Sequence, residues 1–182
     1  MSIDSRFVGD WKLDPIHSRL GFSARHAMVT KIRGAFNEVE GEAHIDSEDW
    51  ANSTASVTIQ VNSIDTRNDQ RDEHLRNADF FNSKEFPTIE FVSTTIDEVD
   101  SGQFIVVGNL TMRGVTKSVS LPLEVTGIGE DSSGQIRAGL EGNRRIDRKE
   151  WGISWNEKLD NGGVMVSDKI SLEFELSLLK VQ

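Results

Sequence analysis

The chain has 182 residues, a formal net charge of −10 at pH 7 and no cysteine. A chain of this length can bury about 70% of the surface that it exposes when unfolded. The lack of cysteine excludes disulfides, thiol catalysis and cysteine-ligated zinc. Because the negative field repels phosphate backbones, we expect no nucleic-acid partner.

The amino-terminal residues MSIDSRFVGDW lack the basic and apolar regions of a secretory signal. No stretch of the chain approaches 18 consecutive apolar residues, the length expected of a transmembrane helix. These features favour a cytoplasmic protein without stable membrane insertion.

Alternation of apolar and polar side chains, which is typical of half-buried strands, recurs along most of the chain. The expected strand regions are residues 9–14, 17–26, 32–45, 54–61, 88–96, 104–112, 119–125, 136–140 and 168–180. Gly34 and Gly41 are expected at bends or bulges of the third region. The last region is the clearest strand, since Ile170, Leu172 and Phe174 begin an unbroken alternation.

The connections between these regions are rich in turn-forming residues. We expect turns or irregular segments at residues 46–52, which contain Trp50, and at 97–102, 113–116, 127–135 and 145–152.

One stretch, Thr66 to Pro87, cannot be read as a strand. We expect a short helical insertion at about residues 67–80, with Asp72 and Arg76 as a surface pair at i,i+4 spacing. Leu75, Ala78, Phe80 and Phe81 supply apolar surface for packing over one end of the strands.

About eight strands with short connections and no repeated strand–helix–strand order indicate an all-β fold, either a sandwich or a barrel. We expect a single antiparallel eight-stranded barrel with one helical insertion, spanning residues 1–182 as a single domain. An eight-stranded barrel is filled by side chains or holds one small ligand, and the pattern alone leaves both open.

Several motifs resemble those of the YceI-like proteins in order, over residues 11–180. The most specific are T-x(4)-R-D-x-H-L-x(3)-D-F-F from Thr66, F-P-x-I-x-F from Phe86 and G-x-L-T-x-R-G-V-T from Gly108. The resemblance implies a lipocalin-like barrel with a long apolar tunnel. It also implies a homodimer and an isoprenoid-chain lipid or similar long apolar amphiphile as ligand.

Binding of such a chain depends on burying its carbons, at about 0.8 kcal/mol per CH₂. We expect the interior residues that contact it to be Phe22, Phe36, Val57, Ile59, Phe91, Leu110, Leu123, Leu140, Trp155 and Phe174. At a barrel mouth, Arg71, His74 or Arg148 could meet a polar headgroup.

Two other functions are open at this point. One is an enzyme acting on an apolar isoprenoid or quinone-like substrate, with His26 or His74 as general base. The other is a ligand-free interaction module with a filled barrel. The four histidines have no metal-ligand spacing, and no nucleophile elbow, phosphate loop or dinucleotide motif is present, so we expect no metal, no cofactor and no catalysis.

Overall fold

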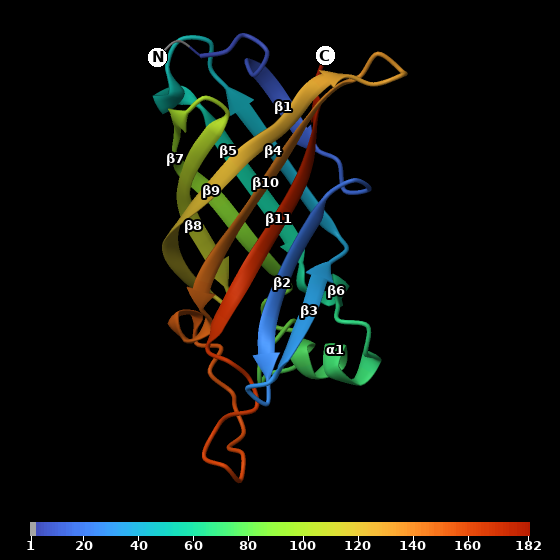
Figure 1. Cartoon of the computed structure of the whole chain (residues 1–182), viewed down its shortest axis with the longest axis vertical. Coiled ribbons are helices and arrows are strands. Elements are labelled where there is room, and N and C mark those ends of the chain that lie inside the picture. Colours follow the sequence, from blue (N-terminus) through green and yellow to red (C-terminus); the bar gives the residue numbers. More distant parts are fainter. Residues whose placement is uncertain (1–2) are drawn as a thin grey trace.

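The computed structural model describes residues 3–182, and its strands form one antiparallel sheet that closes on itself (Figure 1). The strands are β1 (Gly9–Leu13), β2 (Arg19–His26), β3 (Thr30–Phe36), β4 (Val39–Ile45), β5 (Thr54–Gln60), β6 (Ile64–Asp65), β7 (Thr88–Asp100), β8 (Gln103–Met112), β9 (Val115–Glu130), β10 (Ile136–Asp147) and β11 (Lys169–Lys180). The helices are α1 (Asp69–Arg76) and the 3₁₀ turns η1 (Trp50–Asn52), η2 (Val61–Ser63) and η3 (Arg148–Trp151).

The eleven strands make a barrel of eight long strands, because three long strands are each interrupted once. The interrupted strands are β1 with β2, β3 with β4, and β5 with β6. β2 pairs with β3, while β1 pairs with β4 and with the last residues of β11, which closes the ring. In the same way β5 pairs with β4, and β6, beyond η2, pairs with β3. The expected antiparallel eight-stranded barrel is confirmed.

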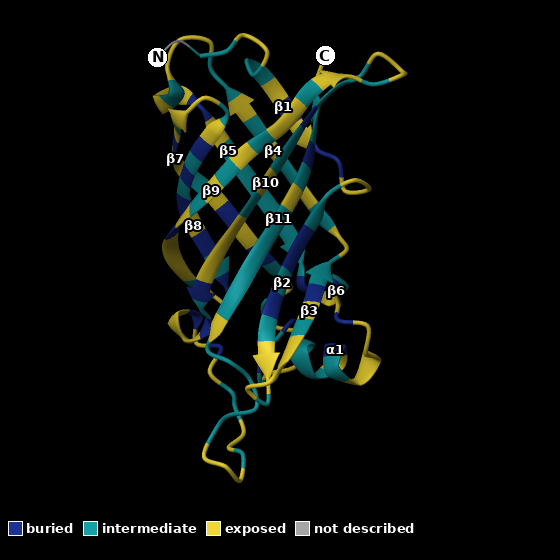
Figure 2. Ribbon diagram, in the orientation of Figure 1, coloured by how far each residue is buried: buried dark blue, intermediate teal, exposed yellow. Residues whose placement is uncertain are grey.

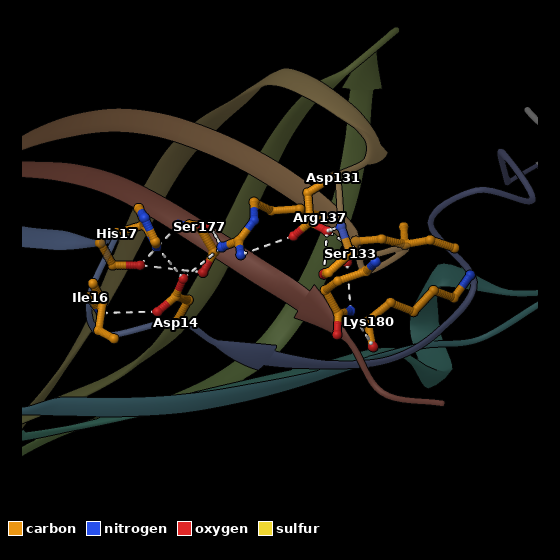
Figure 3. A network of polar contacts seen from close by, with 11 residues as sticks. Asp14, Ile16, His17, Asp131, Ser133, Arg137, Ser177 and Lys180 are labelled. Atoms are coloured by element: carbon orange, nitrogen blue, oxygen red, sulfur yellow. Dashed lines mark hydrogen bonds and ion pairs between the residues drawn. The ribbon is translucent and has the colours of Figure 1, made fainter.

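The interruption between β1 and β2 is fixed by a polar network (Figure 3). Asp14 is only 6% exposed, and its carboxylate lies 2.6 Å from both Arg137 Nη1 and His17 Nδ1. Its backbone N–H donates to Ser177 O. Burial alone would raise the pKa of Asp14, but the hydrogen bonds from Arg137 and His17, aided by the N–H of Ile16, lower it to about 2. The network therefore joins the strand break to β10 and β11.

Four of the five expected turns or irregular segments are shorter than the sequence pattern indicates. β9 begins at Val115, inside residues 113–116, and β10 continues to Asp147, inside residues 145–152. β7 continues through most of residues 97–102 to Asp100, and β9 continues through the first half of residues 127–135 to Glu130. Acidic residues and glycines suggested loops there. The backbone instead stays paired, Glu98 with Phe104 and Glu130 with Ile136, so the strands extend beyond the apolar part of the barrel.

The expectation that Gly34 and Gly41 mark bends or bulges is wrong. Both lie inside paired strands. A side chain at Gly34 would collide with Phe22, since a Cβ built there lies 2.5 Å from Phe22 Cζ. The absence of a side chain lets an aromatic ring lie flat against the wall. The break in this part of the wall falls instead between Phe36 and Val39.

The helical insertion is confirmed but is shorter than residues 67–80, since α1 ends at Arg76. Asn68 caps it by accepting from the N–H of Arg71. The expected surface pair is wrong: Asp72 is 6% exposed and accepts from both the N–H and the hydroxyl of Thr66. This carboxylate therefore ties the helix to the end of β6.

Leu75, Phe80 and Phe81, from α1 and the turns that follow it, face the interior, whereas Ala78 is exposed. α1 and the turns after it lie at the lower end of the barrel in Figure 1, which we call the α1 end. Both chain termini lie at the opposite end, which we call the termini end. None of the helices in residues 3–182 has the length and apolar content needed to cross a membrane.

The interior is packed unevenly. Inward-facing residues of β7 and β8, such as Phe91, Val106 and Leu110, are less than 10% exposed. Leu140 of β10 and the inward-facing residues of β11, such as Phe174, are only half-buried, and Figure 2 shows β11 as intermediate along most of its length. The side chains therefore fill the part of the barrel next to β7 and β8 and leave space beside β10 and β11.

Candidate ligand-binding cavity

The space inside the barrel is a cavity of about 320 Å³. Its lining extends from Phe7, Trp11 and Trp50 at the termini end to Phe80 and Arg148 at the α1 end. The volume falls in the range of small-molecule sites, about 300–1,000 Å³. The barrel is therefore hollow over much of its length.

The lining is almost entirely hydrocarbon. Among the lining residues only Glu42 and Arg148 carry a charge, and Glu42 is solvent-exposed. Alternation along the strands explains this composition, because every second residue of a strand faces the lumen. The cavity offers dispersion contacts and the release of ordered water to an apolar chain.

Two glycines help to keep the lumen open. Gly34 lies opposite Phe22, and Gly108 lies under the ring of Phe91, where a Cβ would be 2.5 Å from Phe91 Cζ. Each ring occupies the space that a side chain on the neighbouring strand would take. The rings thus lie along the wall and do not extend across the lumen.

Most of the residues expected to contact a ligand line this cavity. They are Phe22, Phe36, Val57, Ile59, Phe91, Leu110, Leu123, Leu140, Arg148 and Phe174. Strand parity, the alternation of inward- and outward-facing residues along a strand, is sufficient to predict the nine apolar ones. They come from β2, β3, β5, β7, β8, β9, β10 and β11.

The structure places Arg71, His74 and Trp155 outside the lining. Arg71 donates to the hydroxyl and the carbonyl oxygen of Thr66, so its guanidinium holds the start of α1. His74 Nε2 lies 2.8 Å from Asp79 Oδ2. The His74 ring packs edge-on against Trp155, with ring centroids 4.7 Å apart. These side chains form a layer outside the apolar floor at the α1 end.

Arg148 lines the cavity, but its side chain is only 5% exposed and is held by the protein. It donates to the carbonyl oxygens of Ser167, Ile153 and Val166, and its guanidinium lies 5.9 Å from the Phe80 ring centroid. Burial lowers the pKa of this guanidinium, against the opposing charges of the nearby aspartates. Arg148 therefore fastens together the two ends of the segment 152–168.

At the termini end, the cavity lining includes an aromatic group. Phe7 and Trp50 both pack edge-on against Phe104, with centroid distances of 5.8 and 5.2 Å. Phe7 and Val125 also line a polar surface hollow that includes Arg6. These two side chains form the boundary between the apolar interior and the polar rim.

The lining residues of the termini end carry no signal in the sequence that marks them as site residues. The sequence pattern predicts Trp50 only as part of a polar turn, and it gives no sign that Phe7 and Trp11 line a cavity. Leu172 was recognised on the same face as Phe174, so parity alone would have added it to the site. No local signal indicates that a turn residue such as Trp50 folds over the barrel mouth.

Neither His26 nor His74, the two candidate general bases, lines the cavity. Within residues 3–182, no group of three or more His, Asp or Glu side chains is arranged to hold a metal ion.

An antiparallel eight-stranded barrel around an apolar cavity defines a lipocalin-like barrel. The family model of the YceI-like domain matches residues 11–178, so the chain belongs to the YceI-like family.

Known relatives cover nearly the whole chain. A UPF0312 protein of Staphylococcus aureus (strain USA300) is 33% identical over 165 residues, which is 90% of this chain and 94% of that protein. A UPF0312 protein of Shewanella denitrificans is 34% identical over 159 residues, 87% of this chain and 81% of the relative.

Solved structures share the fold. BcnA of Burkholderia cenocepacia superposes with a TM-score of 0.78 at 24% identity, covering 91% of this chain and 98% of that one. A polyisoprenoid binding domain from Saccharophagus degradans superposes with a TM-score of 0.72 at 16% identity, covering 94% and 98% of the two chains.

Proposed function

We propose that the protein binds an isoprenoid-chain lipid or a similar long apolar amphiphile inside the barrel, and carries or sequesters it without chemical change. The observation that carries the proposal is the hydrocarbon-lined cavity of about 320 Å³. Each methylene transferred into it from water contributes about 0.8 kcal/mol, so a long chain needs few polar contacts to bind.

The likeness to a polyisoprenoid binding domain supports an isoprenoid as the ligand class. The shape of the lumen is consistent with it, since the lining runs along the barrel between its two ends. The proposed contacts are the lining residues already named, and Arg148 contributes mainly by holding the segment 152–168.

The proposal of no catalysis rests on the position of the candidate bases. His26 is exposed beside the 152–168 segment, and His74 is hydrogen-bonded to Asp79 outside the floor. A substrate inside the cavity would reach neither imidazole. A filled interaction module is disfavoured by the hollow interior.

The remaining elements of the proposal come from the family resemblance and the sequence. We propose that residues 1–182 act as a single domain, that two copies form a homodimer, and that the protein works in the cytoplasm. Light scattering tests the dimer directly, because a monomer has a mass of 20.3 kDa.

The test fills the lumen and leaves the outer surface unchanged. Phe174 lines the cavity and is half-buried, so Phe174→Trp places extra ring volume in the lumen. We expect this variant to bind geranylgeraniol at least about tenfold more weakly than the wild type, which corresponds to about 1.4 kcal/mol. The amount of tritiated geranylgeraniol that passes through a desalting column with the protein measures the affinity.

The matched control is Glu175→Trp, which adds a tryptophan to the exposed face of the same strand. We expect this variant to bind like the wild type, and both variants to keep the wild-type circular dichroism spectrum. Equal affinity of Phe174→Trp and the wild type would remove the cavity from consideration as the binding site.

A further inference from the structure

The hairpin formed by β2 and β3 differs in charge from the rest of the chain. The protein has 30 acidic and 20 basic residues, but residues 15–37, which contain the hairpin, include no Asp or Glu. Three basic side chains near the turn are exposed, and we call Arg25, Lys31 and Arg33 the hairpin cations. The hairpin is therefore a local positive region on an acidic protein.

The hairpin cations lie on the outer face of the barrel. Phe22 and Ala24 line the cavity, so the alternation along β2 directs Arg25 outward. Arg25 pairs with Lys31 in the β2–β3 ladder, which places two like charges directly opposite each other. Such a pair destabilises an antiparallel sheet. A bound anion would relieve this repulsion.

The protein does not neutralise these charges itself. None of the hairpin cations forms an ion pair with a carboxylate of residues 3–182. The acidic residues on neighbouring elements are engaged by other side chains, Glu173 by Arg19, Asp65 by Asn37 and Asp168 by Lys149.

The turn of the hairpin exposes two apolar side chains. Met28 is 61% and Val29 is 77% exposed, and within residues 3–182 no other exposed large apolar residues are adjacent in sequence. The N–H of Val29 donates to His26 O and closes the turn, in which Ala27 and Met28 have φ angles of 50° and 66°. Asn-Gly is the usual pair in such a turn, because a Cβ is disfavoured at positive φ. The chain thus presents apolar side chains where the backbone favours small or polar ones.

Segment 152–168 lies along one edge of the hairpin. Met165 O accepts from the N–H of Ala27, and the N–H of Ser167 donates to Arg25 O. These backbone bonds lie in the plane of the sheet and leave the outer face of the hairpin open. Figure 1 shows that the segment extends beyond the turn, so a flat surface can meet the hairpin from the side of the barrel.

The net charge of −10 does not prevent contact with an anionic surface. Charges are screened over about 8–10 Å at physiological ionic strength. Acidic residues such as Asp100 and Glu130 lie at the termini end, and the 16 residues of β9 span about 50 Å between the two ends. The local charge of the hairpin therefore dominates an interaction at its surface.

We propose that the outer face of the β2–β3 hairpin docks on an anionic lipid bilayer. The hairpin cations contact lipid phosphates, and the two apolar side chains of the turn enter the interface between headgroups and acyl chains. Basic residues next to exposed apolar side chains are suited to such surfaces. The docking site does not require the cavity, but its role, exchange of the apolar ligand with the membrane, rests on the proposed function.

Sedimentation with lipid vesicles tests the docking site. The probes are vesicles of phosphatidylcholine alone and vesicles that also contain the anionic lipid phosphatidylglycerol. We expect the wild type to bind the anionic vesicles, to dissociate from them in high salt and not to bind the neutral ones.

Two variants separate the charged from the apolar contribution. Replacing all three hairpin cations by Gln should weaken binding to the anionic vesicles at least about 30-fold. Met28→Asn combined with Val29→Ser should weaken it at least about threefold. The turn should remain folded in this second variant, because Asn tolerates positive φ.

The matched control replaces three exposed lysines outside the hairpin by Gln, namely Lys12, Lys84 and Lys117. It lowers the net charge as much as the triple hairpin variant does. We expect it to bind the anionic vesicles within about threefold of the wild type, since the removed charges are not at the docking face. All three variants should bind geranylgeraniol in solution like the wild type.

Equal weakening by the control and by the triple hairpin variant would overturn the docking site, because only the net charge would then matter. A wild type that binds no anionic vesicles would also overturn it. Dissociation of a wild-type dimer in Met28→Asn/Val29→Ser, measured by light scattering, would assign the turn to a second copy of the chain instead. Loss of geranylgeraniol binding in the wild type with vesicle binding intact would overturn the proposed function and leave the docking site.

Discussion

Single side chains in this barrel act mainly by joining segments that the strand pattern leaves separate. Asp14 connects the break between β1 and β2 to β10, and Asp72 connects α1 to Thr66. Both carboxylates are only 6% exposed, and both accept hydrogen bonds from neighbouring side chains and backbone N–H groups. Their burial is stabilising because each has several donors, and it would be costly without them.

Asp14 should make the stability of the protein sensitive to acid. Its pKa is about 2 in the folded chain and about 3.9 when unfolded, so the unfolded chain binds the proton more readily. The stabilisation, about 2 kcal/mol, is therefore complete above about pH 4 and is lost as the pH falls toward 2. Urea unfolding of Asp14→Asn between pH 2 and 7 should give lower stability at pH 7 and a smaller decline in acid.

Asp160→Asn serves as the control for a lost negative charge, because Asp160 is exposed on the segment 152–168. This variant should follow the wild-type curve. If Asp14→Asn declined in acid as steeply as the wild type, the network would not be the source of the pH dependence.

Strands are shaped by the residues that allow close approach as much as by those that fill space. Gly108 on β8 lies under the ring of Phe91, and a Cβ there would also be 2.6 Å from Val92 O, a backbone atom that cannot move aside easily. Gly127 on β9 has nothing within 4 Å of the corresponding position. The two glycines therefore differ in their tolerance of a side chain.

We expect Gly108→Ala to lower the free energy of unfolding by about 1–3 kcal/mol, the usual cost of overpacking. Gly127→Ala, the matched substitution at an open position, should change it by less than about 0.5 kcal/mol. Urea denaturation of both variants measures the difference. Equal stabilities would mean that the wall can relax around an added methyl group at Gly108.

The sequence predicts the strands well where their two faces differ and poorly at their ends. Parity places Val57, Leu110 and Phe174 in the lining because a strand has a period of two residues. It cannot show that β9 stays paired through Gly127, since pairing depends on β10. Nor can it show that Asp72 faces inward, because i,i+4 spacing describes only the helix and not what the helix covers.

On the scale of the whole molecule, the fold gives the two ends of one lumen different properties. At the α1 end the lining is made by apolar side chains and Arg148, and both termini lie at the other end, where Phe7 and Val125 border a polar hollow. No residue-level motif predicts this difference, because it arises from loops that meet only after the barrel has closed.

The account depends most on the cavity holding a long apolar molecule in the cell. The direct measurement is solvent extraction of freshly purified, undenatured protein, followed by mass spectrometry of the extract. The account predicts one long-chain isoprenoid or similar amphiphile, at close to one molecule per chain. An extract without such a molecule, from protein that also fails to take up added geranylgeraniol, would contradict it.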